Sequence, residues 1–211
     1  IAGGCCGTTP AHIKALTDRC KGMEVPEITE KDITLVSSYS HAVEIGKVPV
    51  IIGERINPTG KSKFKQALRD HNMNYILEEG VKQADSGAHI LDVNVGLPEI
   101  DEPAMMKDTV YELQSILDLP LQIDTTDVTA MEAAMRIYNG KPMLNSVNGK
   151  EESLERVLPL VKKYGAVVVA LCLDDSGIPL DLAGRVAIAE KIIAKAAEYG
   201  IASYDIVVDP L

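Results

Sequence analysis

The sequence predicts an α/β protein whose main part is a (β/α)8 barrel of the TIM type, with about six of the eight β/α units present. Short apolar runs alternate with longer segments whose apolar residues recur at helical spacing, as in a parallel sheet connected by helices. Polar side chains recur where the apolar runs end, which is where such barrels carry their functional groups. The first 22 residues do not continue this alternation.

Composition narrows the possible partners and compartments. The chain has 211 residues, with 21 Lys and Arg against 31 Asp and Glu, so its net charge of −10 argues against nucleic acid or an anionic membrane as the main partner. No apolar run approaches about 18 residues, so no transmembrane helix is expected. No basic start with an apolar segment behind it predicts a secretory signal. Four cysteines, two of them adjacent, favour a reducing cytoplasmic setting over a disulfide framework.

Six strands and five helices account for the alternation from residue 47 onward. The strands are predicted at 48–56, 89–95, 121–124, 143–146, 166–172 and 206–209, and the helices between them at 73–84, 106–117, 128–138, 154–161 and 189–196. The run AVVVALC at 166–172 is apolar throughout, as expected of a strand buried on both faces. A doubly wound sheet is the alternative, but no G-x-G-x-x-G follows the first strand.

The first 46 residues differ in character from the rest. Residues 3–7 form a Gly-Gly-Cys-Cys-Gly turn, and a short helix is predicted from Pro10. Adjacent cysteines bridge each other only with strain, so Cys5 and Cys6 are candidate metal ligands, with a pair of small buried hydrophobic residues as the alternative. Residues 23–46 are interrupted by Pro26 and show no regular periodicity, which predicts a linker that packs on the barrels.

Polar side chains lie at or just past the ends of five of the six predicted strands. They are Glu54, Asn57, Asp92, Asn94, Asp124, Asn145 and Asp209. Any one of them could be a turn or helix-capping residue, but seven at matching positions predict a pocket lined by carboxylates and amides. The sequence has no Ser–His–Asp, H-E-x-x-H or P-loop pattern. Such a pocket suits a neutral ligand rich in N–H donors, and a pterin is one.

Two sets of motifs resemble the cobalamin-dependent methionine synthase family. The first, GGCCGTTPxHI at residues 3–13, is similar to the last strand-to-helix turn of the family's homocysteine-binding barrel. The resemblance implies a zinc ion that binds homocysteine and is held by Cys5, Cys6 and a third cysteine from an earlier strand. That third cysteine has no match here, and we do not expect Cys20 or Cys172 to replace it. We therefore expect an incomplete zinc site.

The second set resembles the family's pterin-binding barrel. IGERINPTG, LDVNVG, IDTT, LNSVNG, DSGIP and VDPL occur in that order between residues 52 and 211. The resemblance implies that Asp124, Asn145 and Asp209 hydrogen-bond the pterin of 5-methyltetrahydrofolate. The loop Lys61, Ser62 and Lys63 is similar to a segment that also reaches the folate. The remaining strand-end residues would line the same pocket, namely Glu54, Asn57, Asp92 and Asn94.

The resemblance divides the chain into a homocysteine-domain tail at 1–22, a linker at 23–46 and a truncated pterin-binding domain at 47–211. A further asparagine that contacts the pterin N5 region follows a seventh strand in relatives, so it would lie beyond residue 211. We therefore expect no catalytic residue within the chain, and no activity of the chain by itself.

The predicted function is methyl transfer from 5-methyltetrahydrofolate to cobalamin, held by a cobalamin-binding domain, and on to homocysteine to form methionine. Three alternatives remain open at the level of the sequence: a stand-alone methyltetrahydrofolate:corrinoid protein methyltransferase, a dihydropteroate synthase-like enzyme and a non-catalytic folate-binding module. The match at residues 3–13 favours the first reading over the stand-alone enzyme and the synthase.

Overall fold

The computed structural model describes residues 2–27, 29 and 31–211. The chain forms two compact units, residues 1–32 and residues 33–211. The first unit contains helix α1 (Pro10–Cys20), which begins after Thr9 and has Pro10 in its first turn, and none of whose residues is buried. The second unit contains all of the described strands.

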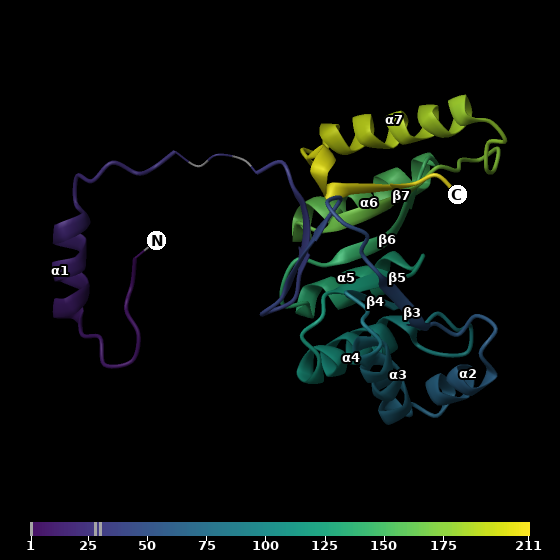
Figure 1. Ribbon diagram of the computed structural model, residues 1–211, viewed down its shortest axis with the longest axis horizontal. Coiled ribbons are helices and arrows are strands. Elements are labelled where there is room, and N and C mark those ends of the chain that lie inside the picture. The colour runs from purple at the N-terminus through teal and green to yellow at the C-terminus, as the bar shows by residue number, and fades with distance from the viewer. Residues whose placement is uncertain (1, 28, 30) are drawn as a thin grey trace. The chain divides into compact units, whose positions relative to one another are not determined.

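The second unit is built on a parallel sheet of six strands (Figure 1), and this confirms the predicted barrel-type alternation. The strands follow the order of the chain across the sheet: β3 (Ile52–Ile56), β4 (Ile90–Val93), β5 (Leu121–Asp124), β6 (Met143–Asn148), β7 (Val167–Leu171) and β8 (Ile206–Asp209). Strands β3 and β8 each pair with one neighbour, so they form the two edges of the described sheet. The sheet is therefore an open arc of the predicted barrel.

Helices connect the parallel strands. They are α2 (Ser62–Arg69), α3 (Met73–Asp85), α4 (Glu102–Ile116), α5 (Val128–Ile137), α6 (Glu151–Tyr164) and α7 (Leu182–Glu198), with a 3-10 turn η1 (Ser203–Asp205) before β8. Aspartates begin three of them, because Asp101, Asp127 and Asp181 each accept a backbone N–H of the first helical turn. Helix α2 was not predicted, because its eight residues show too short a pattern to separate from the loop before it.

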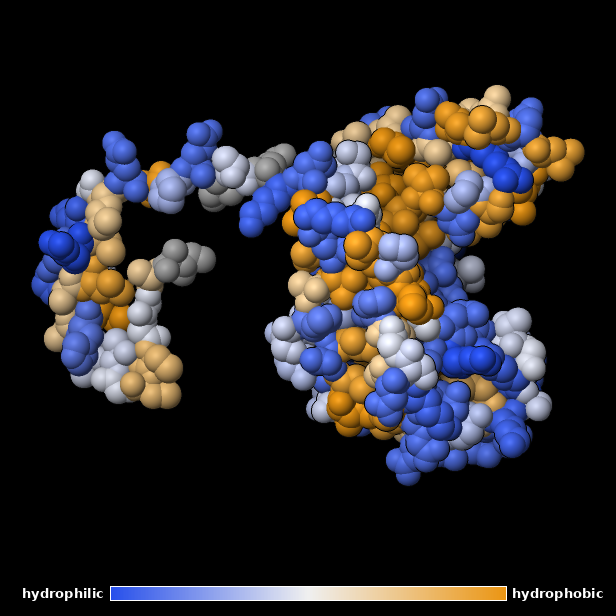
Figure 2. Space-filling view, viewed as in Figure 1, coloured by the Kyte–Doolittle hydropathy of each residue, from blue (hydrophilic) through white to orange (hydrophobic). Residues whose placement is uncertain are grey.

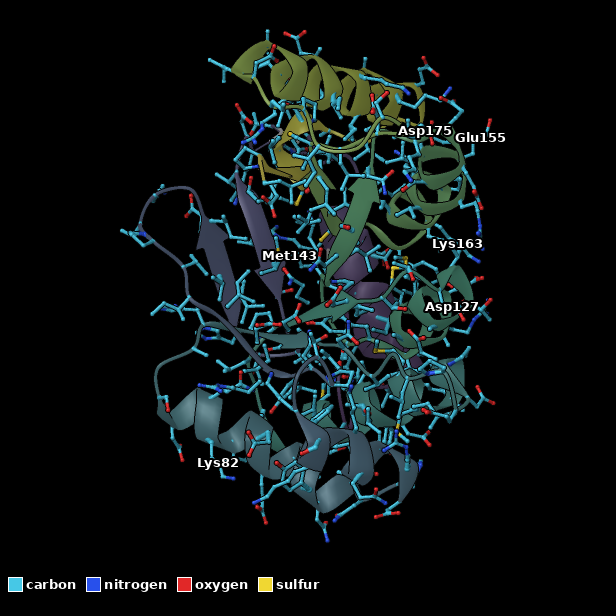
Figure 3. The ribbon with its side chains drawn as sticks, turned by 90° about the vertical axis from the view of Figure 1, so that its right-hand side faces the viewer. Lys82, Asp127, Met143, Glu155, Lys163 and Asp175 are labelled. Atoms are coloured by element: carbon cyan, nitrogen blue, oxygen red, sulfur yellow. The ribbon has the colours of Figure 1, made fainter. Side chains whose placement is uncertain are left out.

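The strands bury hydrophobic side chains on both faces. One cluster fills the space between the sheet and the helices and includes Val93, Ile123 and Leu144, all fully buried. A smaller cluster on the inner face includes Ile90 and Met143. Figure 3 shows Met143 within the sheet. Full burial of such a side chain contributes about 1.5–3 kcal/mol, so the alternating pattern fixes which polar residues face inward.

An antiparallel hairpin, β1 (Thr34–Ser37) with β2 (Ala42–Ile45), packs on the inner cluster through Val36 and Val43. The sequence did not predict these strands, because four-residue strands show too short a pattern and become stable only through tertiary partners. Tyr138 supplies one partner: its hydroxyl donates to Ser37 O at 3.0 Å and accepts the N–H of Leu121 at 2.9 Å. The hairpin therefore covers the inner face near the amino ends of the strands.

The edges of the sheet expose some apolar side chains. Ile51, directly before β3, is 58% exposed and Val208 of β8 is 41% exposed. Figure 2 shows hydrophobic side chains gathered on the face between α7 and β3. Within the described residues, no helix is long and apolar enough to cross a membrane.

Candidate functional site at the carboxyl ends of the strands

The polar residues of three neighbouring strands converge at the carboxyl end of the sheet. Asp92 of β4 lies opposite Gln122 of β5, and Asp124 of β5 lies opposite Asn145 of β6. Because side chains alternate along a strand, Gln122 and Asp124 both face inward, whereas Ile123 between them packs under the helices. Four polar side chains thus lie above the hydrophobic inner cluster, where the sequence predicts a pocket.

Asp124 is half-buried and has one described side-chain partner. The amide nitrogen of Asn94 donates to its Oδ2 at 2.9 Å. The pKa of Asp124 is raised, mainly because burial disfavours the charged form, and the charges of Glu54 and Glu102 act in the same direction. The hydrogen bond from Asn94 works against these effects. Asp124 therefore has acceptor capacity left for a ligand.

Asp92 is the most deeply buried carboxyl group of the site, with 2% of its surface exposed. Gln122 donates a hydrogen bond to its Oδ1, whereas its Oδ2 is buried without a hydrogen-bond partner among the described residues. The pKa of Asp92 is raised to about 7, first by burial and second by the charge of Asp124. Asp92 is therefore the group of this site whose charge changes near neutral pH.

Asn145 lies at an irregularity in β6. It pairs with Val169, and Val147 pairs with the next residue of β7, so Ser146 is an extra residue in the ladder. Bulges of this kind redirect neighbouring side chains and are frequent beside active sites. The amide of Asn145 is close enough to Asp92 to favour its charged form.

The predicted residues of β3 and its loop form a second group. Asn57 donates to the Glu54 carboxylate at 2.9 Å and accepts the N–H of Thr59. Lys61 Nζ donates to the backbone oxygens of Glu54 and Arg55 at 3.0 and 3.3 Å, so it binds the end of the strand. Ser62 and Lys63 begin helix α2 and are exposed.

Asp209 ends the edge strand β8, three strands along the sheet from β5. It lies opposite Leu171, and its Oδ1 accepts the N–H of Leu211 at 2.8 Å. Its backbone oxygen accepts the N–H of Cys172 at 3.0 Å. Burial raises the pKa of the Cys172 thiol, and the charge of Asp209 adds to this. The structure does not bring Asp209 into hydrogen-bond contact with Asp124 or Asn145.

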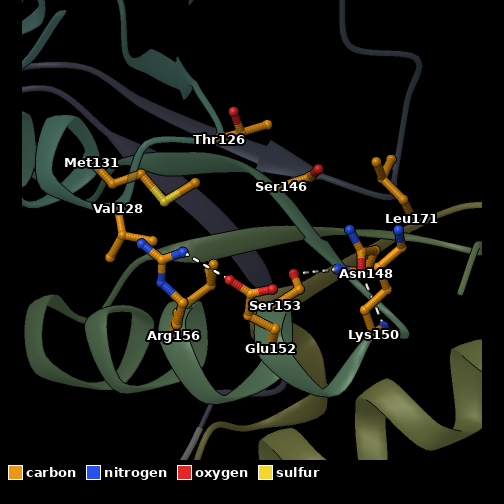
Figure 4. Close-up of a pocket in the computed structure, with 11 residues that line it drawn as sticks. Thr126, Val128, Met131, Ser146, Asn148, Lys150, Glu152, Ser153, Arg156 and Leu171 are labelled. Atoms are coloured by element: carbon orange, nitrogen blue, oxygen red, sulfur yellow. Dashed lines mark hydrogen bonds and ion pairs between the residues drawn. The ribbon is translucent and has the colours of Figure 1, made fainter. Parts of the chain in front are cut away.

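A cavity of about 270 Å³ lies beside the end of β6, between the first turns of α5 and α6 (Figure 4). Ser146 and Asn148 of β6 line it, with Arg156 of α6, which donates to Glu152 at 3.1 Å. None of the ten residues predicted to bind folate lines this cavity.

The candidate zinc ligands lie in the first unit. Cys5 and Cys6 are exposed, and their sulfur atoms are 3.9 Å apart. The pKa of the Cys5 thiol is lowered, first by a hydrogen bond from the Cys6 backbone and then by the Cys6 thiol. No group of three or more His, Cys, Asp or Glu side chains is placed to hold a metal ion in the described part of the chain. Two thiols do not complete a zinc site.

Three polar residues near the site were not predicted from the sequence: Gln122, Thr125 and Glu102. Gln122 is buried and holds Asp92, and it could have been found because it lies two residues before Asp124, on the same face of the strand. The hydroxyl of Thr125 donates to the Glu102 carboxylate in the first turn of α4. No sequence signal indicates that contact, because it depends on how α4 packs against β5.

The chain is similar in sequence to methionine synthases along its whole length. The chain is 32% identical over 225 residues to a methionine synthase of Mycobacterium leprae and 32% identical over 219 residues to one of Mycobacterium tuberculosis. All of the chain is covered in both cases, but it spans only 19% and 18% of those proteins.

Solved dihydropteroate synthases share the fold. The enzyme of Xanthomonas albilineans, with 4-aminobenzoic acid, matches with a TM-score of 0.66 at 20% identity, covering 84% of this chain and 65% of the other. The 7,8-dihydropteroate synthase of Vibrio fischeri ES114 matches with a TM-score of 0.63 at 15% identity, covering 84% and 66%.

Residues 53–211 match the family described as pterin binding enzymes. That range contains the whole parallel sheet except Ile52, together with every strand-end residue of the candidate site. The chain therefore belongs to the pterin-binding enzyme family.

Proposed function

We propose that the inner face of the sheet binds the pterin ring of 5-methyltetrahydrofolate. The observation that carries the proposal is the half-buried Asp124 carboxylate, which Asn94 holds through one oxygen and which lies opposite Asn145. A carboxylate accepts two parallel hydrogen bonds, and the 2-amino group and ring N–H of a pterin donate two. Asn145 and Asp209 supply further polar contacts.

The remaining site residues have supporting roles in this proposal. Asn94 and Asp92 line the pocket beside Asp124, with Glu54 and Asn57 from the next strand. The loop at residues 61–63 reaches the rest of the folate. Lys61 is held at the end of β3 by two backbone oxygens, which places this loop at the carboxyl end of the sheet.

The reaction we propose is methyl transfer from 5-methyltetrahydrofolate to cobalamin and then to homocysteine, as in the methionine synthases that the chain resembles. Cobalamin, when bound by another part of the protein, supplies the nucleophile. Loss of the methyl group from N5 requires N5 to be protonated or hydrogen-bonded, so that the departing amine is neutral. The residues of this chain would orient the pterin for that step, and we assign none of them as the proton donor to N5.

Residues 1–22 would be the end of a homocysteine-binding domain, residues 23–46 a linker and residues 47–211 the pterin-binding domain. Cys5 and Cys6 would be two of the zinc ligands of that first domain. Because the described residues do not complete a zinc site, we derive no step through the metal.

Calorimetric titration with 5-methyltetrahydrofolate tests the proposal. The matched control is p-aminobenzoyl-glutamate, which keeps the tail of folate but lacks the pterin. We expect the first ligand to bind and the second not to bind measurably. Equal affinity for both would place recognition on the tail and overturn the proposed site. Condensation of a dihydropterin pyrophosphate with p-aminobenzoate would instead favour the synthase reading.

A further inference from the structure

The described neighbours of Asp92 leave one of its two carboxyl oxygens without a hydrogen bond. One carboxyl oxygen accepts from Gln122, but the other is buried and has no partner among the described residues. A charged carboxylate has about four lone-pair positions to satisfy, and leaving a buried one empty is costly. A carboxylic acid is neutral, so the cost of burying it is much smaller.

The groups that face Asp92 offer no positive charge. Gln122 of β5 donates to it, the amide of Asn145 on β6 favours its charged form, and the charges of Asp124 on β5 and Glu54 on β3 raise its pKa. Two of these four are themselves carboxylates, and no cationic side chain of the described residues offsets their charge at Asp92. Two neighbouring carboxyl groups without a cation ionise one after the other, because like charges at short range repel.

Burial decides which of the two carboxyl groups ionises first. Asp124 is half-buried and Asn94 donates to it, so its charged form is partly solvated and hydrogen-bonded. Asp92 is almost completely buried and has a free lone pair where a proton can reside. The proton of the pair therefore belongs on Asp92.

We propose that Asp92 is the proton-holding partner of Asp124, remaining a neutral carboxylic acid so that Asp124 is ionised and accepts the hydrogen bonds of the pterin. This role rests on the proposed function. Asp92 is a positioning residue, because it acts through the charge of Asp124 and not through a hydrogen bond of its own to the ligand. A neutral ligand that covers Asp124 removes water from Asp92 as well, which disfavours the charged form of Asp92 further. By linkage, the ligand binds more tightly to the protein in which Asp92 is protonated.

Carbon-13 NMR of protein labelled at its aspartate carboxyl groups tests where the proton resides, without any ligand. We expect one resonance to titrate near pH 7. It should be absent from Asp92→Asn and retained in Asp118→Asn, which removes an exposed carboxyl group from the loop before β5. In Asp124→Asn the midpoint of its titration should move to lower pH, because the charge of Asp124 no longer raises the pKa of Asp92. Loss of the resonance in Asp124→Asn instead would place the proton on Asp124 and overturn the proposal. So would an Asp92 resonance that titrates near pH 4.

The affinity for 5-methyltetrahydrofolate at pH 6.0 and pH 8.5 provides a functional test. If covering the site raises the pKa of Asp92 by one unit from about 7, affinity falls about sevenfold between these values. Asp92→Asn cannot ionise, so its affinity should change less than about twofold over the same range, whereas Asp118→Asn should behave as the unmodified protein. An equal decline in Asp92→Asn would overturn the proposal. Absence of binding at every pH would overturn the proposed function, and the NMR titration would still decide the protonation of Asp92.

Discussion

The side-chain amide of Asn94 donates a 2.9 Å hydrogen bond to Oδ2 of Asp124, across the adjacent strands β4 and β5. Asn94 is itself fixed, because its Oδ1 accepts the N–H of Gly96 at 2.9 Å. Asp124 is therefore oriented before any ligand arrives, with one oxygen engaged and acceptor capacity left on the other. Side chains that are held in place lose less entropy on binding, which favours affinity.

Replacing Asp124 with Asn should weaken binding of 5-methyltetrahydrofolate about ten- to a hundredfold. The change converts one acceptor into a donor and removes a charge-assisted interaction, for which about 1.5–3 kcal/mol is typical. Calorimetric titration measures the effect. The matched control is Asp127→Asn, since Asn caps a helix as well as Asp does and Asp127 caps α5. Unchanged affinity of Asp124→Asn would remove Asp124 from the site.

The stability of the protein should fall as pH rises from about 4 to about 7. The pKa of Asp92 is about 7 in the folded protein, against 3.8 for an ordinary aspartate, so over this range the folded state holds a proton that the unfolded state has released. Asp92 alone lowers the free energy of unfolding by up to about 1.4 kcal/mol per pH unit over this range. Urea denaturation at several pH values should show a flatter profile for Asp92→Asn. A profile identical to that of the unmodified protein would contradict the raised pKa.

Tyr138→Phe should destabilise the second unit by about 1–3 kcal/mol. The change leaves the N–H of Leu121 and the oxygen of Ser37 without their shared partner. Chemical denaturation measures the loss, and hydrogen exchange at Val36 and Val43 shows whether the hairpin opens first. Tyr111→Phe is the control, because Tyr111 is 61% exposed. Equal effects of the two changes would mean that the hydroxyl of Tyr138 does not anchor the hairpin.

Zinc should be present at well below one equivalent after dialysis against a mild chelator. Cys5 and Cys6 supply two thiols, and no third metal-binding side chain joins them in the described residues. Metal analysis of the dialysed protein gives the result. One tightly held equivalent that disappears in Cys5→Ser would show that a further ligand completes the site.

The 211 residues on their own should self-associate and transfer no methyl group. Ile51 and Val208 expose apolar surface along the two unpaired edges of the sheet, and such edges pair with other chains. Size-exclusion chromatography over a range of concentrations, beside a methyl-transfer assay with free cobalamin, tests both statements. A monodisperse chain with full activity would contradict them.

Much of the sheet could be predicted from the sequence, because strands such as β7 are apolar on both faces and five of the six strands carry polar site residues at their ends. The pairing of Asp124 with Asn145 follows from the order of the strands alone. The hairpin and helix α2 could not be predicted, since short elements depend on contacts with distant residues. The orphaned oxygen of Asp92 could not be predicted either, because it results from how β4 and β5 lie in register.

The contacts of the hairpin also constrain the order of events during synthesis on the ribosome. Thr34 donates to the backbone oxygen of Tyr204 at 2.7 Å, and Ser37 pairs with Lys141. The ribosome releases the hairpin segment early, yet these partners follow it by 170 and 104 residues. The hairpin therefore cannot be fully seated until η1 has been translated. Until then the hairpin lacks its contact with η1 and covers the inner face around Ile90 and Met143 less firmly, and partly folded chains with exposed apolar surface are prone to aggregate.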